Sequence, residues 1–244
     1  MQYDDTHSVQ ALRRYNNTVM QAALLRYYFK RYFHATPLNY HYQEATCYNA
    51  KCSFAMQFIG RYHAVEHYWQ WGYSQPDYDP AFYAVVNRMR EHTLAWNDDF
   101  FSQNRCFPAD DILLSWLVNI AVSFGQTPLF ILRRAQDGNV FDVLCVHDNT
   151  LINHLIQMYK SDAEPHEAVL AAWQSVSKFS ALMYQPLRAV AAMASTFDIP
   201  LTQDGCFVSL TLLDKTIRFA HTPPDLMSDP VVVATTHDSV GQAT

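Results

Sequence analysis

The residues with the clearest chemical signature are a histidine pair in the segment HAVEH, which comprises His63, Glu66 and His67. The segment matches the H-x-x-E-H pattern of one class of zinc proteases. There, two histidines on one helical face bind zinc and the glutamate activates water. Here the flanking residues, 54–59 and 69–71, alternate between apolar and polar side chains and predict strands. We therefore predict a turn without metal, and keep a metal-dependent hydrolase as an alternative.

Other catalytic signatures are absent from the sequence, which has neither a G-x-S-x-G motif nor a glycine-rich phosphate loop. The cysteines are odd in number and scattered, so they predict neither a disulfide framework nor a zinc site. They are Cys47, Cys52, Cys106, Cys145 and Cys206. We predict no catalytic residue, no cofactor and a reducing compartment.

Acidic residues beside aromatic ones form the candidate contact surface for a partner. They are Asp77, Tyr78, Asp79, Asp98 and Asp99. Carboxylates can steer a basic partner and a tyrosine can anchor it. Capping of a helix is the alternative role of Asp79, because a proline follows it at the first helical position.

Composition limits the class of protein. Of 244 residues, 50% are hydrophobic and 16% are charged, which excludes a disordered chain. No apolar run approaches the ~20 residues of a membrane-spanning helix, and the acidic N-terminus does not resemble a signal peptide. We therefore predict a cytoplasmic protein that does not bind membranes. The net charge of −6 repels nucleic acid and favours a basic protein partner.

Hydrophobic periodicity divides the first half of the chain into helices and antiparallel strands. We expect a long helix over 6–33, a three-strand meander, two helices and a hairpin. The predicted strands of the meander are 39–46, 54–59 and 68–73, the helices start near 80 and 112, and the hairpin joins 129–134 to 140–146.

The second half of the chain predicts helices followed by short strands. The helical patterns cover 149–160 and 164–197, with a break or kink at Pro186, and the strands are 199–202, 206–212 and 216–220. The fold class expected is α+β. We expect one lobe over 1–147, a smaller helical lobe with strands over 148–222, and a partly disordered tail over 223–244.

Residues 39–147 resemble a bacterial domain family of unknown function. Its pattern is a strand ending in Ile-Gly followed by a W-x-W strand, and it matches here at 58–60 and 69–72. It continues to a hairpin with an aromatic residue and an arginine, here Phe130 and Arg133. Gly72-Tyr73 departs from the Ala-Trp-Ala run usual in the family. The resemblance implies an α+β fold in the bacterial cytoplasm and, for some similar proteins, a role beside secreted toxins.

The function expected from these features is non-enzymatic protein binding. The most specific form of this hypothesis is an immunity protein, monomeric when free, that occludes a cognate toxin carrying a basic cleft. One alternative is a hydrolase, with an unrecognised site or with the metal site at His63, Glu66 and His67. Another is a small-ligand-binding domain with a pocket lined by Trp and Tyr on the sheet.

Overall fold

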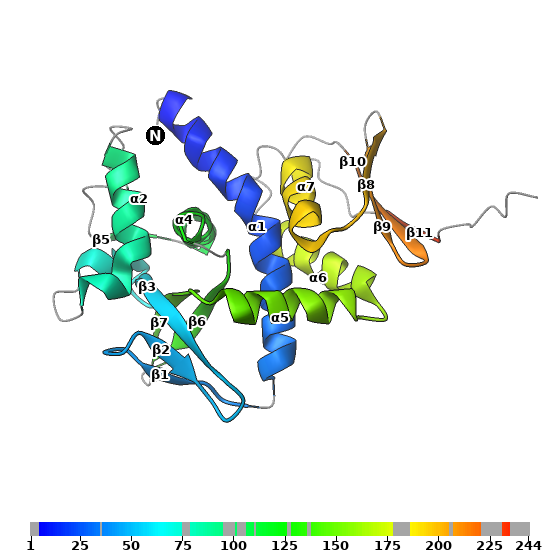
Figure 1. Cartoon of the computed structure of the whole chain (residues 1–244). Coiled ribbons are helices and arrows are strands. Elements are labelled where there is room, and N and C mark those ends of the chain that lie inside the picture. Colours follow the sequence, from blue (N-terminus) through cyan, green and yellow to red (C-terminus); the bar gives the residue numbers. More distant parts are fainter. Residues whose placement is uncertain are drawn as a thin grey trace, which may run out of the picture.

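A 29-residue helix, α1 (Asp5–Phe33), runs through the middle of the structure (Figure 1). The structure is a computed structural model that describes residues 5–34, 36–74, 79–94, 101, 106–109, 111–125, 128–135, 138–177, 186–204, 207–220 and 231–234. Four further helices, α4 to α7, pack against α1. The buried residues of α1 lie all around the helix rather than on one stripe, and they include Tyr15, Met20, Leu24 and Tyr28. Such a helix is stable only when other elements cover every side of it.

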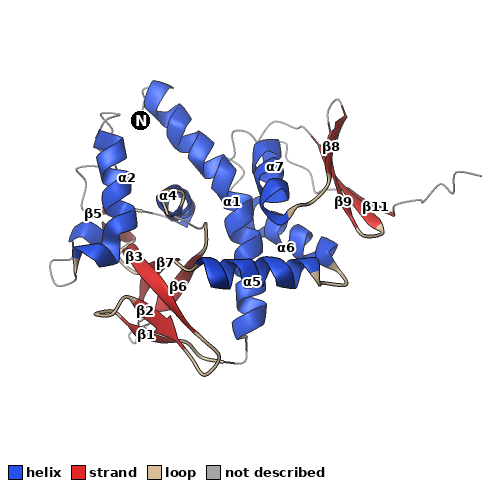
Figure 2. Cartoon of the chain, in the orientation of Figure 1, coloured by secondary structure: helices blue, strands red, loops and turns tan. Residues whose placement is uncertain are grey.

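A seven-stranded antiparallel sheet lies on one side of α1 (Figure 2). It comprises β1 (Asn39–His41), β2 (Thr46–Tyr48), β3 (Ser53–His63), β4 (Tyr68–Trp71), β5 (Cys106–Pro108), β6 (Phe130–Arg134) and β7 (Val140–Val146). The long strand β3 pairs with β2 near its start, with β4 near its end, and with β7 along its other edge. The sheet is therefore organised around β3.

The two motifs of the family resemblance form one packing unit in this sheet. Gly60 on β3 is paired with Trp71 on β4, and the ring of Trp69 lies directly over Gly60. A Cβ atom at position 60 would lie 2.3 Å from Cζ2 of Trp69, so the indole occupies the space that any other residue would need. Both tryptophans are fully buried, which confirms that they share the inward face of the strand.

Short helices extend from this sheet and cover it. They are η1 (Gly72–Ser74), η2 (Pro80–Tyr83), α2 (Ala84–Leu94) and α4 (Asp111–Val122). The side-chain oxygen of Gln57 on β3 accepts a hydrogen bond from the backbone N–H of Val85, at 2.9 Å, and this bond ties the start of α2 to the sheet. Phe101 packs between Trp71 and Trp116 of α4. Aromatic contacts therefore connect the sheet to α4.

The C-terminal part covers the other side of α1. It comprises α5 (Asn149–Lys160), α6 (Pro165–Ser177) and α7 (Pro186–Phe197), followed by β8 (Leu201–Asp204), β9 (Phe207–Leu212), β10 (Lys215–Ala220) and β11 (Val231–Ala234). The four strands form a second antiparallel sheet in the order β11-β10-β9-β8. Phe219 on β10 contacts Trp173 on α6 at 4.9 Å between ring centroids.

The predicted α+β class is confirmed, and the arrangement differs from the expectation in three places. The alternating segment 39–46 contains a turn at residues 42–45, because Ala45 adopts a φ of 52° and the chain reverses between β1 and β2. The β6–β7 hairpin joins the first sheet through the pairing of β7 with β3. A strand, β11, lies within the segment where we expected the tail. Within the described ranges, no helix has the length and apolarity needed to cross a bilayer.

Burial raises the pKa of several tyrosines, so we expect the fold to be sensitive to alkali. The pKa of Tyr15 is raised to about 12, and burial also raises those of Tyr28 and Tyr159. Unfolded tyrosines ionise near pH ~10, whereas the folded chain keeps these hydroxyls protonated. Stability is therefore complete below pH ~10 and falls above it, by up to about 1.4 kcal/mol per pH unit for each such tyrosine.

Urea unfolding at a series of alkaline pH values, together with tyrosinate absorbance, measures this loss. A Tyr15→Phe variant should show a shallower decline, because one ionisable group is removed. The matched control is Tyr48→Phe, in which the replaced ring is 44% exposed and should leave the slope unchanged. A wild-type stability that is flat between pH ~10 and ~12 would contradict the expectation.

Candidate functional site

The HAVEH segment lies in the β3–β4 hairpin, where residues 64–67 form the turn. The imidazole of His63 stacks on its cross-strand neighbour Tyr68, with 4.0 Å between centroids. His67 has a φ of 52°, and its Nδ1 lies 3.3 Å from the hydroxyl of Tyr62. Each imidazole therefore has its own aromatic neighbour, and the helical geometry of a zinc protease is not formed. The described part of the chain holds no group of three potential metal ligands.

The structure describes one of the five predicted partner contacts. The carboxylate of Asp79 is exposed and accepts a hydrogen bond from the backbone N–H of Ala81 at 2.8 Å. Asp79 therefore caps η2, which is the alternative role predicted for it. Asp77, Tyr78, Asp98 and Asp99 lie outside the described residues. Whether these side chains lie near one another stays a prediction.

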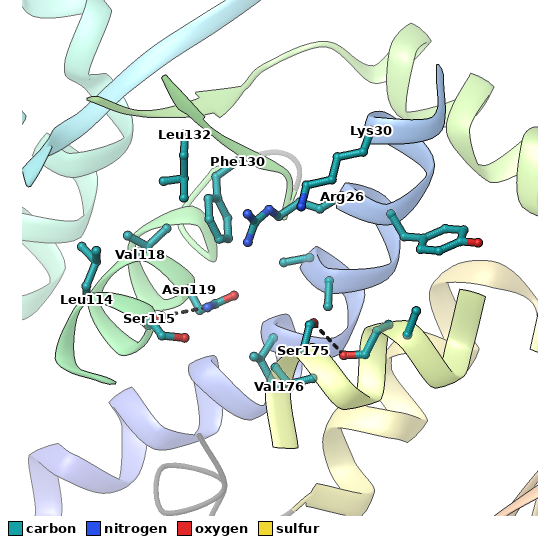
Figure 3. Close-up of a pocket in the computed structure, with 16 residues that line it drawn as sticks. Arg26, Lys30, Leu114, Ser115, Val118, Asn119, Phe130, Leu132, Ser175 and Val176 are labelled. Atoms are coloured by element: carbon teal, nitrogen blue, oxygen red, sulfur yellow. Dashed lines mark hydrogen bonds between the residues drawn. The ribbon is translucent and has the colours of Figure 1, made fainter. Parts of the chain in front are cut away.

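A cavity of about 530 Å³ lies between α1, α4, β6 and α6 (Figure 3). Its walls are mostly apolar and include Val19 of α1, Val118 of α4 and Phe130 of β6. Helix α6 completes the enclosure with Ala171, Ala172, Ser175 and Val176. Lys30, Leu132 and Ser175 are the exposed lining residues and mark the mouth of the cavity.

Arg26 places a positive charge inside this largely apolar cavity. Its guanidinium lies over the ring of Phe130, with Cζ 4.4 Å from the centroid (Figure 3). Among the described residues it forms no ion pair and no hydrogen bond; its only partner is that ring. Burial lowers the pKa of Arg26, but a guanidinium stays protonated at neutral pH. The cavity therefore contains a cation without a counter-ion from the described part of the chain.

Asn119 adds a polar group to the wall opposite Arg26. It is 4% exposed, and its Nδ2 donates to the carbonyl oxygen of Ser115 at 2.8 Å. That carbonyl can only accept, so the amide nitrogen must face it and the amide oxygen must face away. Oδ1 is buried without a hydrogen-bond partner. In Figure 3 it points away from Ser115, towards the space between the helices.

A second polar cluster lies on the opposite face of the first sheet, and its charges are mutually satisfied. Asp142 on β7 is 1% exposed and pairs with Arg61 on β3 at 2.7 Å and Arg133 on β6 at 3.5 Å. The hydroxyl of Tyr42 donates to Asp142 at 2.5 Å and accepts from Arg133 at 2.7 Å. Burial and then the bond to Asp142 raise the pKa of Tyr42. This cluster ties three strands to the β1–β2 turn.

Arg26 and Asn119 are site residues that were not predicted from the sequence. Arg26 lies within the long helix expected over 6–33 and follows Val19, Ala22 and Ala23 by seven, four and three residues. That spacing places it on their face of the helix. Asn119 is likewise a polar residue among apolar ones, in the helix α4, and this pattern is visible in the sequence. The ligand-binding alternative expected a pocket lined by Trp and Tyr on the sheet, but Trp69 and Trp71 of the sheet are buried in the core and do not line this cavity.

Replacing Arg26 by methionine should stabilise the protein, because the desolvation of an unpaired charge is removed while the apolar contact is kept. We expect a gain of about 1–2 kcal/mol in the free energy of unfolding, measured by urea denaturation. The matched control is Arg13→Met on the exposed side of the same helix, which should change it by less than about 0.5 kcal/mol. A loss of stability in Arg26→Met would show that the fold needs this charge.

Comparison with known proteins identifies a family for the larger part of the chain. Residues 17–148 match the family of unknown function named DUF6882. The match contains most of α1 together with α4 and β6, and it ends before α6, so one wall of the cavity lies outside it. No curated protein and no solved structure matches. Because the match covers more than half of its length, the chain belongs to the DUF6882 family, whose function is unknown.

Proposed function

We propose that this protein is a non-enzymatic binding protein that holds a small amphipathic anion in the cavity between α1, α4, β6 and α6. The observation that carries the proposal is the guanidinium of Arg26, largely buried and facing no carboxylate within the described residues. Removing a charge from water costs several kcal/mol unless an opposite charge compensates it. An anionic ligand would provide that compensation.

The walls indicate that the rest of the ligand is apolar. Valine, leucine, alanine and phenylalanine side chains supply most of the lining, as in sites that bury the body of a ligand and orient it with few polar groups. A volume of about 530 Å³ falls within the range of roughly 300–1,000 Å³ typical of small-molecule sites. Size, lining and charge therefore favour the same kind of ligand.

Titration with decanoate, a straight-chain carboxylate, tests this proposal by calorimetry on the full chain. We expect saturable binding that Arg26→Met weakens at least tenfold, since a charged hydrogen bond contributes about 1.5–3 kcal/mol. Arg13→Met should bind decanoate like the wild type. Ala171→Phe, which adds a ring to the α6 wall, should also weaken binding because it fills the cavity.

The control ligand is decanol, which has the same chain without the charge. If decanol binds the wild type as tightly as decanoate, or if Arg26→Met keeps full affinity, the guanidinium does not hold the ligand and the proposal is wrong. Unchanged binding to Ala171→Phe would place the ligand elsewhere on the protein.

Toxin neutralisation by a cytoplasmic immunity protein is the second candidate function. The net charge of −6 and the exposed carboxylate of Asp79 support attraction to a basic partner. The described cysteines Cys47, Cys52 and Cys145 are free, which suits a reducing compartment. In this proposal the segments that contain Asp77, Tyr78, Asp98 and Asp99 form the contact surface.

The experiment for this candidate is co-expression with a toxin encoded next to the gene, followed by pull-down at increasing salt. We expect a complex whose association slows as salt rises, because exposed charges are screened over roughly 8–10 Å. Asp79→Lys should slow association further, and Glu44→Lys, which reverses a charge on the exposed β1–β2 turn, is the control. Protection without a complex would exclude occlusion as the mechanism.

A further inference from the structure

We infer that the ligand of this cavity is a monocarboxylic acid with a hydroxyl or N–H donor on its apolar body, the carboxylate binding Arg26 and the donor binding Asn119. The inference rests on the proposed function and specifies the chemistry of its ligand. It depends on two polar groups that line the cavity: the guanidinium of Arg26, which has no hydrogen bond among the described residues, and the unpartnered Oδ1 of Asn119.

The placement of Arg26 favours a carboxylate over other anions. Phe130 covers one face of the planar guanidinium, so its N–H donors point outward along the edges of the plane. A carboxylate can accept two parallel hydrogen bonds from such an edge. The other cationic lining residue, Lys30, is exposed at the mouth. With one cation inside, the described walls balance a single negative charge better than the double charge of a phosphate monoester.

The unpartnered Oδ1 of Asn119 favours a donor on the ligand. Nδ2 already donates to Ser115, whereas Oδ1 has no hydrogen-bond partner among the described residues, so the unmet requirement of this amide is for a donor. A ligand with an entirely apolar body would leave Oδ1 buried and unpaired, whereas a hydroxyl or N–H would satisfy it. Oδ1 is covered by the surrounding atoms, so a ligand donor reaches it through a small side-chain adjustment of the kind that accompanies binding.

Three matched probes separate the two contacts: para-hydroxyphenylbutyrate, phenylbutyrate, which lacks the donor, and para-hydroxyphenylbutanamide, which lacks the charge. By calorimetry on the full chain, we expect the hydroxylated acid to bind about tenfold more tightly than each of the other two, consistent with one hydrogen bond gained or lost. Equal affinity of the two acids for the wild type would overturn the role of Asn119. Equal affinity of the hydroxylated acid and its amide would overturn the role of Arg26.

Variants assign each difference to its residue. Asn119→Leu should abolish the preference for the hydroxylated acid and leave the affinity for phenylbutyrate unchanged. Arg26→Met should abolish the preference for the acid over the amide. Each comparison is the ratio of the affinities of two probes for the same variant. A general loss of stability lowers both affinities and does not change that ratio. If Asn119→Leu fails to fold, Asn119→Ala provides the same comparison.

A preference for the hydroxylated acid that persists without the Asn119 amide would overturn the inference. If decanoate binds through Arg26 but the wild type shows no preference for the hydroxylated acid, the proposed function stands and this inference alone fails. If neither decanoate nor any probe binds, both fail.

Discussion

The burial of apolar residues around most of the circumference of α1 is the constraint on which the rest of the structure depends. A helix with apolar residues on every side cannot be satisfied by one sheet, and here the first sheet with α4 covers one side while α5, α6 and α7 cover the other. The chain on either side of residue 148 therefore shares one hydrophobic core built on this helix. Arg26 is the exception within it, since its charge faces a space that the surrounding elements leave empty.

The first sheet depends in turn on β3. This strand has neighbours on both edges, and the absence of a side chain at Gly60 lets the indole of Trp69 lie against its backbone. The ion pairs between Asp142, Arg61 and Arg133 then join β3, β7 and β6 on the opposite face. Packing on one face and charge pairing on the other hold the strands that position Phe130 at the cavity.

Local patterns in the sequence predicted the elements better than their assembly. The long helix, the strands around Gly60 and Trp69 and the Asp79 cap were predicted correctly, because each depends on residues close together in the chain. The pairing of β7 with β3 depends on residues 77 to 90 positions apart and has no local signal. The cavity requires four elements at once, so helical spacing could place Arg26 on a face but could not show which elements enclose it.

The position of α6 makes the cavity composite, because one wall comes from outside the segment that defines the family. A ligand that touches α1 and α6 together acts as a bridge between the two parts of the chain. By thermodynamic linkage, a free ligand concentration one hundred times the dissociation constant would stabilise the state in which α6 packs against α1 by about 2.7 kcal/mol. Substitutions along α6 can also change the shape of the cavity without disturbing the sheet that is organised around β3. In the proposed binding function, the family segment would supply the frame of the cavity, and α6 would limit which molecules fit.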